Sequence, residues 1–250
     1  MPESLRNYKA PDKALADRVI LVTGAGDGIG RAVSLALAAH GATVILLGRT
    51  VKKLESVYDE IVDGGGPTPA IYPLNLEGAK ESDYEDMAER IEREYGRLDG
   101  LLHNAGILGY LSPIQHLDGM DWARVMHVNL TAPFLMTKAL LPVLEKSGDA
   151  SVVFTSSGVG RKGRAYWGAY AVSKFGTEGL MQVLADELEN AGRVRVNSIN
   201  PGATRTQMRQ SAYPGEDPDT LPAPEDITAG YLYLLGPGSK GVTGQAFDAQ

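Results

Sequence analysis

Tyr170 and Lys174 are the residues of this chain whose types and spacing most directly suggest catalysis. They begin and end the stretch YAVSK, and the surrounding residues 167–189 contain few helix breakers. In a helix, residues four apart lie above one another on one face. An ammonium beside a phenol favours the phenolate and lowers a pKa that is otherwise near ~10. The pair could therefore act as a general acid and base, although such a pair also arises by chance on amphipathic helices.

Composition limits the classes of protein to which the chain can belong. The 250 residues are 43% hydrophobic and 22% charged, which suits one large α/β domain. A formal net charge of −7 argues against nucleic acid as a partner. The absence of cysteine excludes disulfides and fits a cytoplasmic protein. The N-terminus is polar and the apolar runs are strand-sized, so we expect neither a signal peptide nor a membrane partner.

A glycine-rich stretch near the N-terminus has the sequence context of a phosphate-binding turn. The β-branched run at 19–23 predicts a buried strand, and a helical pattern follows the glycines to about residue 40. Gly24, Gly28 and Gly30 give the spacing G-x-x-x-G-x-G. Glycines permit a tight turn and a close approach to a pyrophosphate, and the free N–H groups at the helix start favour an anion. Any tight strand-to-helix turn can use glycine, but the flanking elements favour nucleotide binding.

Arg49 ends the second apolar run, about 20 residues after the glycines. In dinucleotide folds an acidic residue at this place accepts a hydrogen bond from the ribose 2′-OH, whereas a basic residue accommodates a 2′-phosphate. The chain has no carboxylate there, so Arg49 predicts a preference for NADPH over NADH. Asp27 places a negative charge near the same phosphate and argues in the other direction. Alternatively, Arg49 is simply exposed to solvent.

Strands and helices alternate through the rest of the chain. We expect helices at 51–63 and 81–95, and strands at 42–47, 70–73, 98–103 and 151–155. This alternation predicts an α/β fold with a single doubly wound parallel sheet and helices on both faces. Ligands bind such sheets at the carboxyl ends of the strands, where the chain has Asn104, Ala105 and Gly106. Asn75 and Leu76 follow another strand and are expected near the adenine, although Asn75 could equally be a turn residue.

Two further polar residues stand at unusual places. Asn129 lies within the apolar helix expected at 122–144, where an asparagine is unfavourable unless it has a specific hydrogen-bonding task. Ser157 follows the strand at 151–155, where a serine could also be a turn residue or a helix cap. The histidines His40, His116 and His127 show no metal-ligand spacing, so we expect no metal.

Taken in order, these motifs resemble the short-chain dehydrogenase/reductase family. The resemblance rests on TGAGDGIG, HNAG, Asn129, Ser157, Tyr170-x-x-x-Lys174 and Asn200-Pro201-Gly202, and it extends from about Arg18 to the C-terminus. Ser157 precedes Tyr170 by 170 − 157 = 13 positions, as the family pattern requires. The chain departs from that pattern at His103, where the family often has asparagine, and at Asn75, where it often has aspartate.

The resemblance implies a Rossmann-type fold and hydride transfer between a nicotinamide dinucleotide and a small-molecule carbonyl or alcohol substrate. Tyr170 would be the general acid and base, Lys174 would lower its pKa and bind the nicotinamide ribose, Ser157 would hold the substrate carbonyl, and Asn129 would support a water chain. The cofactor would be NADPH/NADP, with NADH/NAD as the alternative. It would be bound by Thr23, Gly24, Gly26, Asp27, Gly28, Ile29, Gly30, Arg49, Asn75, Leu76, Asn104, Ala105, Gly106, Tyr170, Lys174, Pro201, Gly202 and Thr204.

The expected organisation is an N-terminal arm at 1–17, loosely held, and one domain at 18–250 with a substrate lid at about 204–222. Arg205 and Arg209 in the lid lie four apart and could meet an anionic substrate, or they pair with Glu216 or Asp217. The family resemblance also implies a homo-oligomer, a dimer or tetramer, built on the helices at 122–144 and 169–190. The alternative function is a dinucleotide-binding regulatory or scaffold protein without turnover, which loss of Tyr170 or Lys174 would have favoured.

Overall fold

The computed structural model describes residues 5–250 and contains one seven-stranded sheet. The strand order is β3-β2-β1-β4-β5-β6-β7, and every neighbouring pair is parallel. The predicted fold class, a doubly wound parallel sheet, is confirmed. The strands are β1 Val19–Thr23, β2 Thr43–Gly48, β3 Ala70–Pro73, β4 Gly100–His103, β5 Ala150–Thr155, β6 Val194–Asn200 and β7 Ala246–Asp248.

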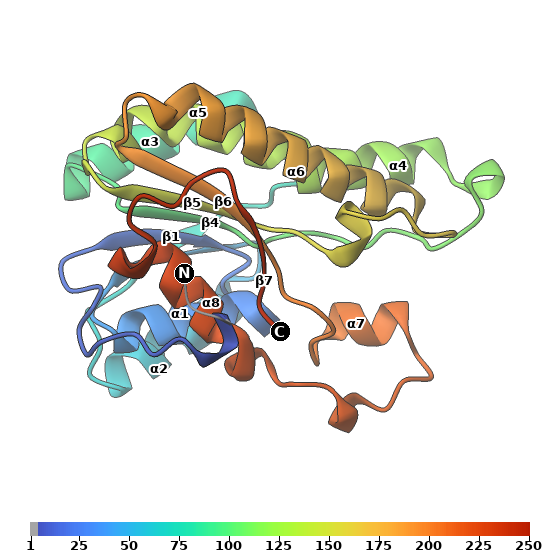
Figure 1. Cartoon of the computed structure of the whole chain (residues 1–250), viewed down its shortest axis with the longest axis horizontal. Helices are drawn as coiled ribbons and strands as arrows, with labels where there is room; N and C mark the ends of the chain where they lie inside the picture. The colour runs from blue at the N-terminus through green and yellow to red at the C-terminus, as the bar shows by residue number, and fades with distance from the viewer. Residues whose placement is uncertain (1–4) are drawn as a thin grey trace.

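Helices cover both faces of the sheet (Figure 1). Helices α3, α5 and α6 lie on one face with α4 beside them, and α1, α2 and α8 lie on the other. Helix α7 stands apart from both layers, within the segment that follows β6. The helices are α1 Gly28–Ala39, α2 Val51–Asp63, α3 Glu81–Tyr95, α4 Gly119–Met126, α5 Ala132–Glu145, α6 Gly168–Glu189, α7 Gln207–Ala212 and α8 Thr228–Leu235.

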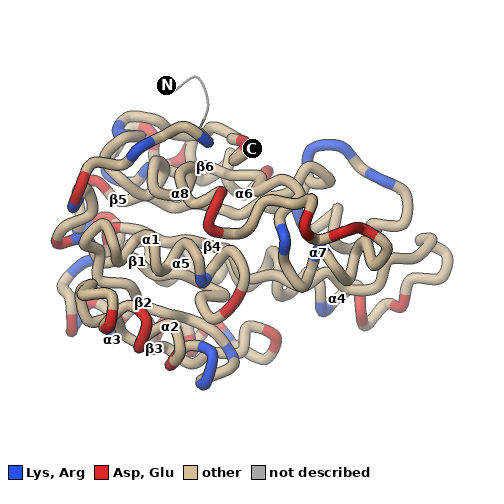
Figure 2. The backbone as a smooth tube through the Cα atoms, turned by 90° about the horizontal axis from the view of Figure 1, so that it is seen from below, with Lys and Arg blue, Asp and Glu red and all other residues tan. Residues whose placement is uncertain are grey.

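The central strands β1, β2, β4 and β5 are buried on both faces, apart from the two end residues of β2, which explains their continuous apolar sequences. β1 to β5 contain no Lys, Arg, Asp or Glu, whereas α2 and α3 carry many of these residues on their outer faces (Figure 2). One apolar cluster packs between the sheet and α3, α5 and α6, and a second packs between the sheet and α1, α2 and α8. Because every neighbouring pair of strands is parallel, the carboxyl ends of the strands lie along one edge of the sheet.

Most predicted elements are present with boundaries shifted by one or two residues. β4 begins at Gly100 instead of residue 98, and α6 covers 168–189 where 169–190 was expected. β6 and β7 are strands that were not predicted from the sequence. β6 contains Arg195 and two asparagines, which weaken its apolar signal, and β7 has only three residues.

The long helix expected at 122–144 is interrupted. Helix α4 ends at Met126, residues His127–Thr131 form a π-helical turn, and α5 then continues to Glu145. The wider turn contains Asn129. Such π-turns are frequent at functional sites because they change the direction in which side chains project.

The described part of the N-terminal arm is held against the domain. Leu5 and Leu15 are 6% and 1% exposed and belong to the core on the α8 side, and the Leu15 amide donates to the carbonyl of His40. The expectation that the whole arm is loosely held was wrong for residues 5–17, because apolar side chains separated by polar ones anchor it. Residues 1–4 lie outside the described residues. Across residues 5–250, no helix combines the length and apolarity that a membrane span requires.

Candidate active site

A groove of about 390 Å³ lies at the carboxyl ends of the strands. It brings together the glycine-rich turn, the residues after β2 and β4, the end of β5 and the start of α6. From the predicted set it contains Gly24, Gly26, Asp27, Gly28, Ile29, Arg49, Asn75, Leu76, Asn104, Ala105, Gly106, Tyr170, Lys174 and Pro201. The glycine-rich motif and the YAVSK motif, far apart in sequence, therefore border one groove.

The turn between β1 and α1 depends on glycine at specific positions. Gly24 and Gly28 have φ of 68° and 51°, in the left-handed region that glycine adopts without strain. A Cβ on Gly30 would lie 2.2 Å from the Gly24 carbonyl oxygen. The turn can therefore bring its backbone close to a bound group at the start of α1, where N–H groups lack helical partners. This geometry fits the pyrophosphate of a dinucleotide.

Thr23 and Asn104 connect the ends of β1 and β4 behind this turn. The Thr23 hydroxyl accepts from the amides of Asn104 and Ala105 at 2.9 and 3.0 Å, and it donates to the Leu102 carbonyl at 3.2 Å. The Asn104 side-chain amide donates to the Thr23 carbonyl at 3.2 Å. Thr23 thus supports the turn without bordering the groove.

Arg49 and Lys53 place two basic side chains at the end of the groove beyond β2. Lys53 Nζ is 2.5 Å from Asp27 Oδ2, and both residues border the groove. This hydrogen bond is the largest cause that lowers the pKa of Asp27. The Asp27 charge that argues against a 2′-phosphate is therefore compensated by Lys53, a residue not identified from the sequence. The sequence feature that could have identified Lys53 is its position four residues after Arg49, on the first turn of α2.

Tyr170 and Lys174 lie at the other end of the groove, and Ser157 lies beside Tyr170. Burial raises the pKa of Tyr170 to about 12, and a hydrogen bond with the Ser157 side chain acts in the opposite direction. Burial also lowers the pKa of Lys174 to about 8, while the charge of Glu178 raises it. Near pH 7 the tyrosine is therefore a protonated phenol and the lysine is mostly an ammonium.

The expected lowering of the Tyr170 pKa by Lys174 is not found in this structure. Lys174 Nζ lies 5.7 Å from the centre of the Tyr170 ring and donates at 2.7 Å to the carbonyl of Thr155. Burial of the phenol has the larger effect, so its pKa rises. The ammonium lies over the ring face and its hydrogen bond is directed to the backbone of β5.

Asn129 has a structural task that explains its place in the π-turn. Its side-chain oxygen accepts from the Ile107 amide at 2.8 Å, and its nitrogen donates to the Ile107 carbonyl at 2.9 Å and to Ser173 Oγ at 3.1 Å. Asn129 therefore fixes the segment after β4 against α6. It does not border the groove itself.

His103 is a buried residue at the end of β4. Its Nε2 lies 2.7 Å from Thr137 Oγ1, and its ring stacks on Phe154 at 4.8 Å. Burial and the Lys174 charge lower its pKa to about 3, so the ring is neutral. This agrees with the interpretation of His103 as a structural strand-end residue and adds a hydrogen-bond partner on α5.

Four other predicted site residues lie outside the groove lining. Gly30 and Ser157 follow Ile29 and Ser156 in the sequence, and these two residues do border the groove. Gly202 and Thr204 follow β6, where the side-chain amide of Gln250 donates to the carbonyls of Pro201 and Ala203 and to the Thr204 hydroxyl. The C-terminal residue thus fixes this loop. The groove also contains residues that were not predicted individually, at Thr155, Ser156 and Thr206–Met208.

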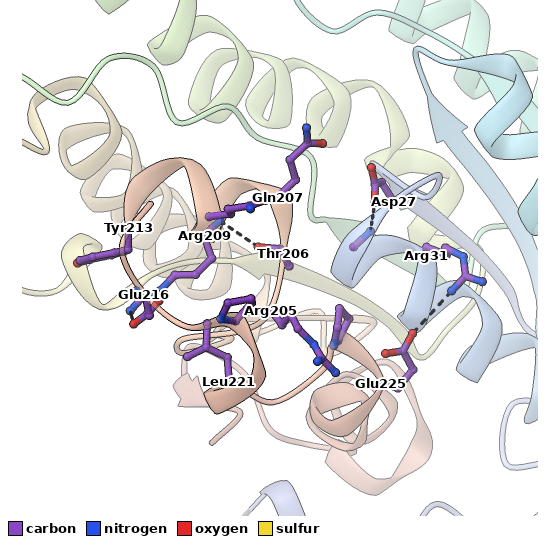
Figure 3. Close-up of a pocket in the computed structure, with 14 residues that line it drawn as sticks. Asp27, Arg31, Arg205, Thr206, Gln207, Arg209, Tyr213, Glu216, Leu221 and Glu225 are labelled. Atoms are coloured by element: carbon purple, nitrogen blue, oxygen red, sulfur yellow. Dashed lines mark hydrogen bonds and ion pairs between the residues drawn. The ribbon is translucent and has the colours of Figure 1, made fainter.

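A second hollow of about 540 Å³ lies between the start of α1 and the segment at 204–222, where a substrate lid was expected (Figure 3). Arg209 pairs with Glu216 at 2.6 Å and Arg205 with Asp219 at 2.8 Å. The pairing of Arg209 with Glu216 was one of the two interpretations of the lid arginines, whereas Arg205 pairs with Asp219 instead of Glu216 or Asp217. The two arginines do not share a helix face, because α7 begins only at residue 207. Carboxylates thus already neutralise both guanidinium groups.

Comparison with known proteins agrees with this geometry. The pattern of the family described as short chain dehydrogenase matches residues 18–217. The chain is an oxidoreductase of the short-chain dehydrogenase family. Members of this family use a nicotinamide dinucleotide, and the resemblance inferred from the motifs is confirmed.

Individual relatives cover almost the whole chain. It is 52% identical to the uncharacterized oxidoreductase YciK of Escherichia coli K12, over 98% of this chain and 96% of the relative. A solved short chain dehydrogenase from Pseudomonas syringae has a TM-score of 0.96 and 60% identity, over 98% of this chain and 99% of that one. Another from Escherichia coli CFT073, complexed with NADPH, has a TM-score of 0.93 and 54% identity, over 96% and 100% of the two chains.

Proposed function

We propose that this protein is an NADPH-dependent reductase of a small-molecule carbonyl compound, with Tyr170 as the general acid. The observation that carries the proposal is the placement of the buried Tyr170, with Lys174 beside its ring, in the same groove as the glycine-rich turn. The complex of the Escherichia coli CFT073 relative with NADPH supports the choice of cofactor. The reverse oxidation of an alcohol uses the same groups in the opposite order.

The protonation states suit reduction near neutral pH. A carbonyl carbon that accepts hydride leaves negative charge on its oxygen, which takes a proton from the Tyr170 hydroxyl. The Ser157 hydroxyl stabilises that developing charge by a hydrogen bond. Lys174, protonated below about pH 8, stabilises the phenolate that remains on Tyr170. Asn129 and Thr155 fix the backbone on both sides of these groups.

The groove would hold the dinucleotide along its length. The turn at 24–30 would bind the pyrophosphate, Asn75 and Leu76 would border the adenine, and Lys174 with Pro201 would border the nicotinamide end. The bound nicotinamide supplies the hydride, and the chain contributes position and electrostatics. Arg49 and Lys53 would meet the 2′-phosphate that distinguishes NADPH from NADH.

Substitution of Arg49 tests the choice of cofactor. The wild-type protein is expected to bind NADPH more tightly than NADH, because only NADPH presents the phosphate to Arg49. In Arg49→Ala the affinity for NADPH should fall by on the order of tenfold or more, since a charge-assisted hydrogen bond contributes about 1.5–3 kcal/mol. The affinity for NADH should change little. Nucleotide fluorescence gives both constants, and the shift in melting temperature checks them by mass action.

Lys53→Ala provides a comparison within the same experiment. It removes a basic side chain and also leaves the Asp27 carboxylate without its ion pair. The affinity for NADPH should therefore fall, and the affinity for NADH should hardly change. Equal weakening of both nucleotides by Arg49→Ala would show that Arg49 does not bind the 2′-phosphate. Binding of neither nucleotide by the wild-type protein would overturn the assignment of the groove.

We further propose that the protein is a homo-oligomer that assembles through α5 and α6. Phe134 on α5 and Val172, Phe175 and Val183 on α6 are exposed apolar side chains, and apolar patches of this kind are typical of interfaces. Light scattering coupled to size exclusion is expected to give a dimer or tetramer. Phe175→Glu, which puts a charge in the patch, should lower the mass. A monomeric wild-type protein at micromolar concentration would contradict the proposal.

A further inference from the structure

Helix α6 presents a third ionisable side chain in line with the two of the YAVSK motif. Tyr170, Lys174 and Glu178 follow one another at intervals of four residues, so they lie along one face of the helix. Lys174 and Glu178 are 5% and 6% exposed. A buried carboxylate is costly unless hydrogen bonds and opposite charges compensate it. The environment of Glu178 therefore needs an explanation.

The Glu178 carboxylate is fixed from two sides. One oxygen accepts from Ser198 Oγ of β6 at 2.6 Å, and the other lies 3.2 Å from Nε of Arg161. Arg161 also pairs with Asp248 at 2.9 Å and donates to the Phe247 carbonyl of β7 at 2.7 Å. The carboxylate is thus held by β6 and, through Arg161, by the C-terminal strand. It has little freedom to move away from Lys174.

Lys174 benefits from a nearby negative charge. Its ammonium donates to the Thr155 carbonyl, but burial favours the neutral amine, which could no longer stabilise a phenolate at Tyr170. Glu178 acts against this effect and raises the pKa of Lys174. Residues four apart on a helix have Cβ atoms about 5–6 Å apart, close enough for a strong effect where solvent is excluded.

We propose that Glu178 is a positioning residue for the acid–base pair, one that acts on Lys174 through the negative charge that it holds one helical turn away on the same buried face. Its consequence for turnover rests on the proposed function, whereas its effect on Lys174 does not. Arg161 is expected to act in the opposite direction, because its positive charge partly cancels the negative charge of the Glu178 carboxylate at Lys174. The proposal therefore requires that substitutions of the two residues have opposite effects on Lys174, which a purely structural ion pair would not produce.

The other charged groups around α6 do not replace this carboxylate. His103 of β4 is neutral, as its lowered pKa shows. On α4, Asp121 pairs with Arg124 at 2.8 Å. Other ionisable groups on the surrounding elements are His127 in the π-turn, Asp248 of β7, which pairs with Arg161, and Arg195 at the opposite end of β6, which pairs with Asp149. Tyr231 of α8, whose hydroxyl lies 3.4 Å from Thr155 Oγ1, is uncharged because burial raises its pKa.

The test compares the pH dependence of kcat/KM for carbonyl reduction in wild type, Glu178→Gln and Arg161→Gln. At alkaline pH, kcat/KM is expected to fall as Lys174 loses its proton, and this fall is the alkaline limb of the profile. Without the carboxylate the pKa of Lys174 falls, so the limb of Glu178→Gln should move to lower pH by on the order of one unit. In Arg161→Gln the carboxylate is less compensated, so the limb should move to higher pH. Glu178→Asp, which keeps the charge, should restore most of the wild-type profile.

Ser198→Ala is the matched control, because it changes how the Glu178 carboxylate is held and keeps its charge. It removes one hydrogen bond to Glu178, so the rate should fall slightly while the limb stays in place. Melting temperatures and NADPH affinity show whether each variant is folded. The proposal would be overturned if the alkaline limb of the pH profile stayed in place in folded Glu178→Gln and Arg161→Gln. It would also be overturned if the limb moved in the same direction in both variants.

A second measurement does not depend on turnover. In protein labelled with ¹³C at the lysine Cε positions, the Lys174 signal, assigned by its loss in Lys174→Arg, can be titrated by NMR. The midpoint should be lower in Glu178→Gln and higher in Arg161→Gln than in wild type. If these shifts were observed but the enzyme reduced no carbonyl compound, the proposed function would be contradicted and the role of Glu178 would stand. An unchanged Lys174 midpoint in Glu178→Gln would contradict the role of Glu178 even if the enzyme is active.

Discussion

Tyr170→Phe is expected to abolish carbonyl reduction while leaving the fold and the dinucleotide groove intact. The change removes the hydroxyl that donates the proton and little volume. General acid catalysis contributes about 10²–10⁴-fold to a rate, so kcat should fall by that order. Loss of a hydrogen bond to Ser157 costs about 0.5–1.5 kcal/mol of unfolding free energy. The measurements are steady-state rates with a good carbonyl substrate, NADPH affinity and the melting temperature.

Tyr84→Phe gives the same chemical change at another buried tyrosine. Tyr84 lies on α3, fully buried, and its hydroxyl has no hydrogen-bond partner within residues 5–250. Removing an unsatisfied hydroxyl should leave turnover unchanged and stability equal or slightly higher. If Tyr170→Phe retained the wild-type rate, another group would have to supply the proton.

The architecture was predictable because the strands of a sheet covered on both faces are continuous apolar runs. The stretches at 19–23, 43–48 and 150–155 are fully apolar or nearly so, and no competing helical pattern obscures them. β6 was not predicted because its polar residues have partners that only the fold supplies. Arg195 pairs with Asp149, and Ser198 donates to Glu178. Local sequence does not show that a polar residue will be satisfied by a distant one.

The candidate site was predictable where spacing within one element determines it. The glycines of one turn and the four-residue interval from Tyr170 to Lys174 are properties of local sequence. The direction of the Tyr170 pKa was not predictable in the same way, because it depends on burial by elements that fold over α6. Nor did the spacing show that the Lys174 ammonium is directed to the Thr155 carbonyl at 2.7 Å. Helical periodicity predicts which side chains are neighbours and not which hydrogen bond each forms.

The same limit applies to interactions between segments. Lys53 compensates Asp27 from 26 positions away, and Gln250 fixes the loop after β6 from the end of the chain. Both act on residues that the sequence motifs identified, but neither belongs to a motif. Asn129 is intermediate: its unfavourable position in an apolar helix predicted a hydrogen-bonding task, and the structure shows that Ile107 and Ser173 are the partners.

Gly30→Ala is expected to produce the largest loss of dinucleotide binding from a single added methyl group. The new Cβ would lie 2.2 Å from the Gly24 carbonyl oxygen and 2.6 Å from the side-chain nitrogen of Asn104. A backbone oxygen cannot rotate away, so the turn itself must move. Overpacking of this kind costs about 1–3 kcal/mol of unfolding free energy. A similar loss of binding free energy corresponds to roughly 10- to 100-fold weaker NADPH binding.

Gly119→Ala separates the steric effect from the loss of a glycine. Gly119 begins α4 and its φ is not positive. Within the described part of the chain, a Cβ at this position would meet no heavy atom of a non-neighbouring residue closer than 4 Å. Alanine there should leave NADPH affinity unchanged and keep or slightly raise the melting temperature, because alanine favours helix.

Fluorescence titration with NADPH and thermal unfolding of both glycine variants provide the comparison. Loss of affinity in Gly30→Ala alone would follow from the contact with the Gly24 carbonyl, because both variants add the same methyl group. Wild-type NADPH affinity in Gly30→Ala would mean that distortion of the turn does not affect the ligand. The glycine-rich turn would then not be the pyrophosphate site.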